Sequence, residues 1–138
     1  MKFEILQLII DFGLVILIWL VQLCIYPAFT FFSEKNLLKW HKAYTPRITF
    51  VVLPLMLSQL ILSIYFLNNT LNIRNLLIFS LVITTWATTF LIYVPLHQKI
   101  NTGEESYKTS NKLVKLNWVR LVLWNLVFVI NCYFLFFS

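Results

Sequence analysis

The sequence predicts an all-α fold, a transmembrane antiparallel four-helix bundle that forms a single domain over residues 1–138. Apolar residues make up 60% of the chain and charged residues only 12%, whereas a soluble domain carries about 25% charged residues. Four continuous apolar runs, each roughly 19–22 residues long, can cross a hydrocarbon core about 30 Å thick. They do not alternate apolar and polar residues as the strands of a membrane barrel do. The runs cover residues 5–26, 48–67, 76–96 and 119–137.

Each helix can be justified in order along the chain. The first apolar run is too long for a secretion signal and has no small-residue cleavage site after it, so it predicts a retained helix. The second helix is expected to begin after Ser33, a favourable N-cap residue, and to bend near Pro46. The short polar connection 68–75 predicts a hairpin of the second and third helices, and a lysine stripe that can extend to headgroups starts the fourth. The predicted helices cover residues 4–27, 34–67, 75–101 and 111–137.

The basic residues predict the orientation of the chain in a membrane. Nine of the 11 Lys and Arg residues fall in the segments 27–47 and 97–120, and the other two are Lys2 and Arg74. Cytoplasmic loops carry an excess of Lys and Arg, so both termini are expected outside, in a bacterial inner (plasma) membrane. The net charge of +6 then indicates contact with anionic lipid headgroups on the cytoplasmic side. It does not indicate nucleic-acid binding, because these charges flank apolar runs.

Polar and large aromatic residues from all four predicted helices gather near the cytoplasmic end. In a bilayer, ionisable and amide side chains are costly unless they pair or line a cavity. Helical spacing places the members from each helix on one face, which predicts a polar pocket that opens toward the cytoplasmic leaflet. A structural interpretation stays open for each residue alone, since Trp and Tyr also anchor helices at membrane interfaces. The predicted pocket residues are Trp19, Gln22, Tyr26, His41, Tyr44, Trp86, Tyr93, His97, Asn117, Arg120 and Trp124.

These residue types predict binding, or binding and transformation, of a small hydrophobic molecule. His97 or His41 would be the catalytic acid or base, because imidazole titrates near neutral pH. Arg120 would hold an anionic or enolate oxygen. Asn117 and Tyr44 would orient the ligand, the three tryptophans would wall the pocket, and the remaining residues would complete the binding surface. The sequence leaves open whether the chain is an enzyme and whether the two histidines touch.

Short motifs resemble those of a known family. The chain has "VPLH" at residues 94–97, "NWVR" at 117–120 with Trp124 beyond it, and the aromatic-proline step Tyr26–Pro27. This combination resembles small four-helix bacterial membrane proteins that are distantly similar to the anthrone-oxygenase-like family and mostly have no assigned function. The resemblance implies a pocket for an aromatic or quinone-like molecule, with site roles for His97, Asn117 and Arg120. Related proteins often have Asn where His97 stands, so the oxygenase reaction itself does not transfer directly.

Several alternatives stay open. His41 and His97 could ligate a metal ion or a haem iron, although zinc sites use three or four ligands and the sequence adds only Cys24, Glu34, Glu104 and Glu105 nearby. No cofactor is strongly indicated. The chain could instead be a subunit of a homo-oligomeric transporter or channel, or a structural or accessory membrane protein whose polar cluster locks the bundle. Asp11, the only acid inside a span, could pair with Asn131 or Asn125 or act as a proton or ion group.

Overall fold

The computed structural model describes residues 2–103 and 105–137, and every regular element among them is a helix, which confirms the all-α fold class. In chain order the elements are α1 (Lys2–Leu20), η1 (Val21–Ile25), α2 (Tyr26–Ala28), η2 (Phe29–Phe31), α3 (Glu34–Asn69), α4 (Ile73–Thr88), η3 (Thr89–Tyr93), α5 (Val94–Thr102) and α6 (Ser106–Phe137). The η1 and η3 segments are π-helical turns, and η2 is a 3-10 turn.

Four helical segments are long and apolar enough to cross a membrane, as predicted. The first runs from α1 through η2, the second is α3, the third runs from α4 through α5, and the fourth is α6. The bounds of the four segments are Lys2–Phe31, Glu34–Asn69, Ile73–Thr102 and Ser106–Phe137.

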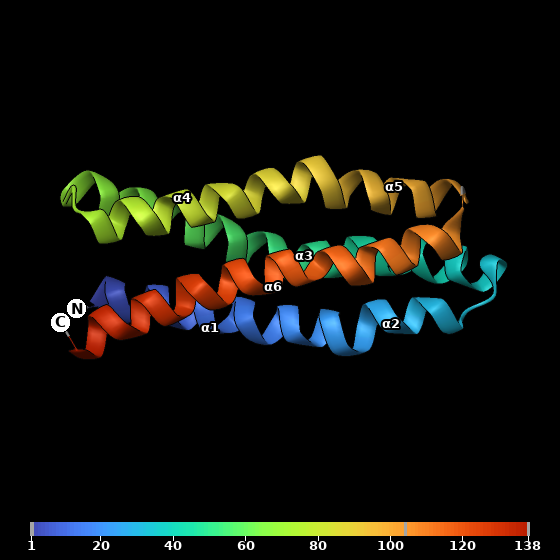
Figure 1. The fold of residues 1–138 in the computed structure, drawn as a ribbon, viewed down its shortest axis with the longest axis horizontal. Helices are drawn as coiled ribbons and strands as arrows, with labels where there is room; N and C mark the ends of the chain where they lie inside the picture. The colour runs from blue at the N-terminus through green and yellow to red at the C-terminus, as the bar shows by residue number, and fades with distance from the viewer. Residues whose placement is uncertain (1, 104, 138) are drawn as a thin grey trace.

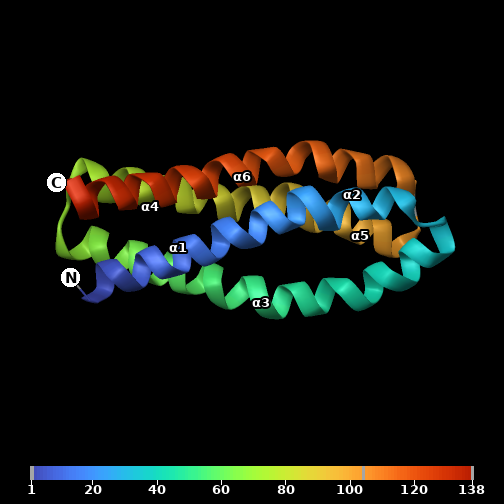
Figure 2. The same ribbon diagram turned by 90° about the horizontal axis from the view of Figure 1, so that it is seen from below.

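The four segments pack side by side as a helix bundle (Figures 1 and 2). α1 and α4 each pack against both α3 and α6. The start of α1 and the end of α6 lie at one end of the bundle, together with the turn between α3 and α4 (Figure 1). The opposite end holds α2, α5 and the first turns of α3 and α6, and we call it the α2–α5 end.

The distribution of polarity is the reverse of that in a soluble protein. Large apolar side chains face outward along the bundle, for example Ile9, Phe50 and Leu91, which are 63%, 83% and 77% exposed. Lipid favours such a surface and water disfavours it. The fold is therefore consistent with an integral membrane protein. Polar side chains are buried between the helices, where they can bond to one another: Gln7, Asp11, Gln22, His41, Gln59, Asn75, Asn117, Arg120 and Asn131.

Two π-helical turns interrupt the first and third segments, and each lies directly before a proline step. Proline has no N–H and clashes with the carbonyl four residues back, and η1 and η3 widen the helix at this point. The N–H of Tyr26 bonds to the carbonyl of Val21, and the N–H of Val94 bonds to the carbonyl of Thr89, each five residues back. One extra residue in a turn rotates the following face by about 100°. This rotation places Tyr26 and Tyr93, which are 2% and 1% exposed, in the interior.

The long helix α3 runs unbroken through Pro46 and Pro54, and Figure 2 shows it bowed along its length. Ser33 occupies its N-cap position, but the Ser33 side chain makes no capping hydrogen bond. The Ser33 carbonyl accepts the first intrahelical bond, from the Leu37 N–H at 2.8 Å. A bend specifically at Pro46 stays a prediction.

A polar cluster centred on Asp11 ties the helices together away from the α2–α5 end. Asp11 is fully buried, and its two carboxylate oxygens accept hydrogen bonds from Gln59 Nε2 at 2.6 Å and from Asn131 Nδ2 at 2.7 Å. Arg74 Nη2 in turn donates to Asn131 Oδ1 at 3.2 Å. The partner of Asp11 in α6 is thus Asn131, whereas Asn125 accepts from elsewhere. These side-chain hydrogen bonds join α1, α3, α4 and α6.

Candidate functional site

A cavity of about 340 Å³ lies between the helices at the α2–α5 end. Small-molecule pockets span about 300–1,000 Å³, so this volume suits a compact ligand. All four long helical segments contribute to its lining, and exposed Thr49 of α3 and Gln98 of α5 lie at its rim. Six of the predicted pocket residues line it: Tyr26, Tyr44, Tyr93, His97, Arg120 and Trp124. The rest of its wall is largely aliphatic and includes Leu17, Ile18, Val21, Ile48, Val52 and Val94.

Arg120 supplies positive charge to this cavity. Its side chain is only 8% exposed. Nε and Nη2 donate to Asn117 Oδ1 at 3.0 and 2.6 Å, and Nη2 also donates to the Tyr26 hydroxyl oxygen at 2.9 Å. The guanidinium carbon lies 3.9 Å from the centre of the Tyr93 ring and 5.9 Å from that of Trp124, so aromatic faces also stabilise the cation.

The charge of Arg120 has no acidic partner among the described residues, and its Nη1 makes no hydrogen bond to any of them. Arg120 is also the only Lys or Arg among the described residues that line the cavity. The lysines near the starts of α3 and α6 are exposed and do not line it: Lys35, Lys39, Lys42, Lys108, Lys112 and Lys115. A buried cation with free N–H groups at a cavity wall is arranged to bind an anionic or strongly polarised oxygen.

Asn117 and Gln22 hold Arg120 in place from behind. Asn117 is fully buried and donates through Nδ2 to Gln22 Oε1 at 2.9 Å, while Gln22 Nε2 donates to the Val114 carbonyl at 3.1 Å. These bonds fix the amide of Asn117 with its oxygen toward Arg120. Both residues were predicted to bind ligand. Neither lines the cavity, and the structure places them as supports of Arg120.

The two histidines are in direct contact. His41 Nε2 and His97 Nδ1 lie 2.7 Å apart, and the two rings stack with their centres 5.0 Å apart. The other nitrogen of His97, Nε2, lies 2.9 Å from the Tyr26 hydroxyl, and the other nitrogen of His41, Nδ1, lies 2.7 Å from Asn101 Oδ1. His97 lines the cavity, whereas His41 is fully buried behind it.

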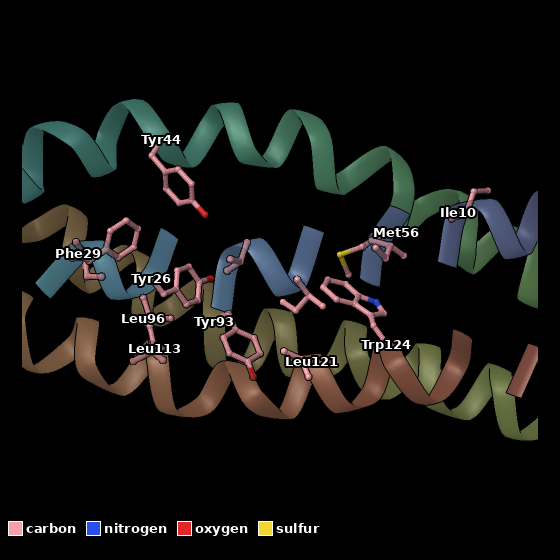
Figure 3. Packing of buried hydrophobic residues seen from close by; sticks show 14 of the residues in the cluster. Ile10, Tyr26, Phe29, Tyr44, Met56, Tyr93, Leu96, Leu113, Leu121 and Trp124 are labelled. Atoms are coloured by element: carbon pink, nitrogen blue, oxygen red, sulfur yellow. The ribbon is translucent and has the colours of Figure 1, made fainter. Parts of the chain in front are cut away.

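Tyrosine side chains complete the polar lining. Figure 3 shows Tyr44 reaching from α3 toward the interior, opposite Tyr26 and Tyr93. The Tyr44 hydroxyl makes no hydrogen bond to any residue that the structure describes, so it is free to bond to a ligand. The Tyr93 hydroxyl donates to the Leu116 carbonyl at 2.7 Å, which leaves its ring as the contact surface for Arg120. Phe29 packs edge-on against the rings of Tyr44 and His41.

Two of the predicted wall residues lie outside the cavity. Trp19 is 37% exposed and contacts Trp118 and Asn125, with its indole N–H 3.4 Å from Asn125 Oδ1. Trp86 stacks on Phe90 and packs against the hydrophobic core. The prediction placed Trp19 on one helix face with Tyr26, and Trp86 on one face with Tyr93. The π-turns η1 and η3 lie between the two positions and rotate that face away.

Sequence reasoning missed Asn101 and gave Thr45 no role in binding. Both line the cavity, and Thr45 Oγ1 lies 3.3 Å from His41 Nδ1. Asn101 follows His97 by four residues on α5, and residues at that spacing share a helix face. The spacing was therefore a usable signal, but Asn101 falls close to the helix end, where polar residues are common.

The predicted metal alternative can be compared with the donors at the site. Among residues 2–103 and 105–137, no group of three or more His, Cys, Asp and Glu side chains could hold a metal ion. All four ring nitrogens of His41 and His97 already lie within hydrogen-bond distance of other groups. Cys24 is exposed and free, Glu34 and Glu105 are exposed, and Glu104 lies outside the described residues.

The chain matches no protein-family model, no curated protein and no solved structure. The resemblance to the anthrone-oxygenase-like proteins therefore stays a prediction, and the geometry of the site alone carries the functional argument.

Proposed function

We propose that this chain is an integral protein of a bacterial inner membrane, an antiparallel bundle with both termini outside, that binds a small, largely apolar molecule bearing an anionic or strongly polarised oxygen. The basic residues support this orientation, because most of them lie at the α2–α5 end. The cavity would then open at the level of the cytoplasmic leaflet. An aromatic or quinone-like ring suits its aliphatic and aromatic walls.

The observation that carries the proposal is the state of Arg120. A buried guanidinium is costly unless a partner compensates its charge, and no described carboxylate does so. Arg120, whose Nη1 has no hydrogen bond to a described residue, and Tyr44, whose hydroxyl has none either, both line one cavity. An oxygen bound there would receive hydrogen bonds from both side chains. His97, in the same lining, is the acid–base group if the bound molecule is also transformed.

The test is a binding measurement on the protein in lipid nanodiscs, with 2-naphthoate as the anionic probe and 2-naphthamide as its neutral match. Titration calorimetry should show tighter binding of the naphthoate. Arg120→Gln should weaken naphthoate binding by about 10-fold to 100-fold, because hydrogen bonds to charged groups contribute about 1.5–3 kcal/mol. Binding of the naphthamide should change little.

Arg47→Gln is the matched control. Arg47 is exposed on α3 at the same end of the bundle and does not line the cavity, so its loss should leave both affinities unchanged. Tyr44→Phe serves if Arg120→Gln does not fold, because the Tyr44 hydroxyl has no partner among the described residues to lose. This variant should weaken naphthoate binding about 10-fold, the lower end of the effect of a hydrogen bond to a charged group. If neither probe binds and Arg120→Gln only lowers thermal stability, the polar cluster is a structural lock and the proposal fails.

A further inference from the structure

Four hydrogen bonds join five side chains into one continuous chain at the cavity. It begins at Arg120 Nη2, which lies 2.9 Å from the Tyr26 oxygen. Tyr26 lies 2.9 Å from His97 Nε2, and His97 Nδ1 lies 2.7 Å from His41 Nε2. The chain ends at His41 Nδ1, 2.7 Å from Asn101 Oδ1.

The two ends of the chain fix where the hydrogens lie. Arginine can only donate, so the Tyr26 oxygen accepts at the first contact. At the far end, the Thr45 hydroxyl donates its hydrogen to the His41 carbonyl at 2.8 Å, so at its 3.3 Å contact with His41 Nδ1 the Thr45 oxygen can only accept. Asn101 Oδ1 is an acceptor as well. His41 Nδ1 therefore carries a hydrogen.

The remaining hydrogens follow if both imidazoles are neutral. An imidazolium here would lie near the Arg120 guanidinium without a carboxylate among the described lining residues, and such a pair of buried cations is unfavourable. Neutral His41 must then accept through Nε2 from the Nδ1–H of His97, and neutral His97 must accept through Nε2 from the Tyr26 hydroxyl. Every hydrogen in the chain points from Arg120 toward Asn101.

Both ends of this chain reach the cavity at different places. Tyr26 is 2% exposed and lies beside Arg120, where the proposed ligand oxygen binds. Asn101 lines the same cavity on the last turn of α5 and is half-buried. His41, which connects them, is fully buried and does not line the cavity. The chain thus bypasses the ligand space through the protein interior.

We propose that Tyr26, His97 and His41 form a proton relay whose resting arrangement carries protons from Arg120 toward Asn101, and that the molecule bound at Arg120 is a weak acid such as a phenol or an enol. This inference rests on the proposed function. The O–H bond of the ligand breaks as its proton passes to Tyr26, Tyr26 passes its own proton to His97 Nε2, and His97 passes one from Nδ1 to His41 Nε2. His41 then gives one from Nδ1 to the oxygen of Thr45, which lines the cavity, as the Thr45 hydroxyl passes its own proton to water beside Asn101. One proton leaves, and the negative oxygen of the ligand stays on Arg120.

The direction of the hydrogens decides what the relay can do. In the resting arrangement Tyr26 can take a proton only by giving up its own to His97, so the relay moves protons from the Arg120 side of the cavity to the Asn101 side. After transfer both imidazoles carry their hydrogen on Nε2, and the Tyr26 hydroxyl donates to the ligand oxygen. His41 acts through His97 and never touches the ligand. It is a positioning residue that also provides the exit.

The test uses 4-nitrophenol, whose absorption distinguishes phenol from phenolate, and its methyl ether 4-nitroanisole, which has no proton to lose. At a pH where the free probe is a phenol, the wild-type protein in nanodiscs should bind it as phenolate and release one proton. The anisole should bind without release. In His41→Gln, the Gln oxygen can accept from His97 but cannot pass a proton on. This variant should still bind 4-nitrophenol, but the absorbance change from phenol to phenolate should be about 10²-fold slower in stopped-flow mixing, the lower end of what positioned proton transfer contributes to a rate.

Nitrogen-15 spectra of histidine-labelled wild-type protein give a second readout that needs no variant. Both rings should carry their hydrogen on Nδ1 in the free protein and on Nε2 after 4-nitrophenol binds. A free protein with an Nε2–H ring or an imidazolium overturns the relay, as does an equal rate of proton release by His41→Gln. Wild-type protein that binds 4-nitrophenol as the phenol also overturns the relay but leaves the proposed function standing. If neither 4-nitrophenol nor 2-naphthoate binds, both proposals fall.

Discussion

The substitution Asn117→Asp tests whether the net charge of Arg120, rather than its shape, binds the ligand. Asn117 Oδ1 lies 2.6 Å from Arg120 Nη2 and 3.0 Å from Nε, and aspartate keeps the same size and both acceptor contacts. The guanidinium therefore keeps both of these bonds and gains a carboxylate partner, while the bond that Asn117 Nδ2 donates to Gln22 Oε1 is lost. A ligand carboxylate on Nη1 would lie on the other side of the guanidinium, about 6 Å from the new one. At an effective dielectric constant of about 20, that separation corresponds to a repulsion of about 3 kcal/mol.

This repulsion should weaken 2-naphthoate binding by about 100-fold, since 1.4 kcal/mol is tenfold in affinity. Binding of neutral 2-naphthamide should stay within about twofold, because the cavity walls do not change. The measurement is titration calorimetry in nanodiscs, with thermal unfolding of the same samples to confirm that the bundle is intact. If naphthoate affinity falls no more than naphthamide affinity in a folded Asn117→Asp protein, Arg120 does not hold an anion and the reasoning is refuted.

Three further outcomes are expected. Asp11→Leu should destabilise the bundle by about 2 kcal/mol, because two buried amide donors lose their acceptor and such bonds contribute about 0.6–1.7 kcal/mol each in membranes. Unchanged thermal or denaturant unfolding would contradict the structural role of Asp11. Pro95→Ala restores an N–H that can bond to the Leu91 carbonyl and turn η3 into an α-turn, which rotates α5. Naphthoate binding should then be lost while the protein stays folded. Full retention of binding would show that the π-turn does not position His97. Trp19→Ala and Trp86→Ala should leave naphthoate affinity within about twofold, and a large loss in either would mean that the cavity extends to that side chain.

The fold class could be predicted because it depends on the average hydrophobicity of long segments. A run such as residues 5–26 is apolar over its full length, and a few wrong assignments within it do not change its ability to cross a membrane. Buried polar side chains were predictable for a related reason. Arg120 and His41 would be costly in lipid, and so the sequence alone indicates that they turn inward.

The finer geometry depended on single-residue register, which the sequence signals only weakly. Counting 3.6 residues per turn placed Trp19 with Tyr26 and Trp86 with Tyr93, but the extra residue in each π-turn breaks that count. The X–Pro steps mark where such turns can form. They do not say whether the helix there widens, kinks or stays straight. The contact between the two histidines was also beyond the sequence, because it depends on the packing of α3 against α5.

The uncompensated guanidinium of Arg120 makes the electroneutrality of the interior depend on the solution around the protein. Any small anion that reaches Nη1 in the folded bundle, and has no comparable site in the unfolded chain, adds RT ln(1 + [L]/Kd) to the free energy of unfolding. The counter-ion of the purification buffer, whether chloride, acetate or a bulky sulfonate, therefore sets part of the melting temperature. Preparations of this protein in different salts are thermodynamically different samples.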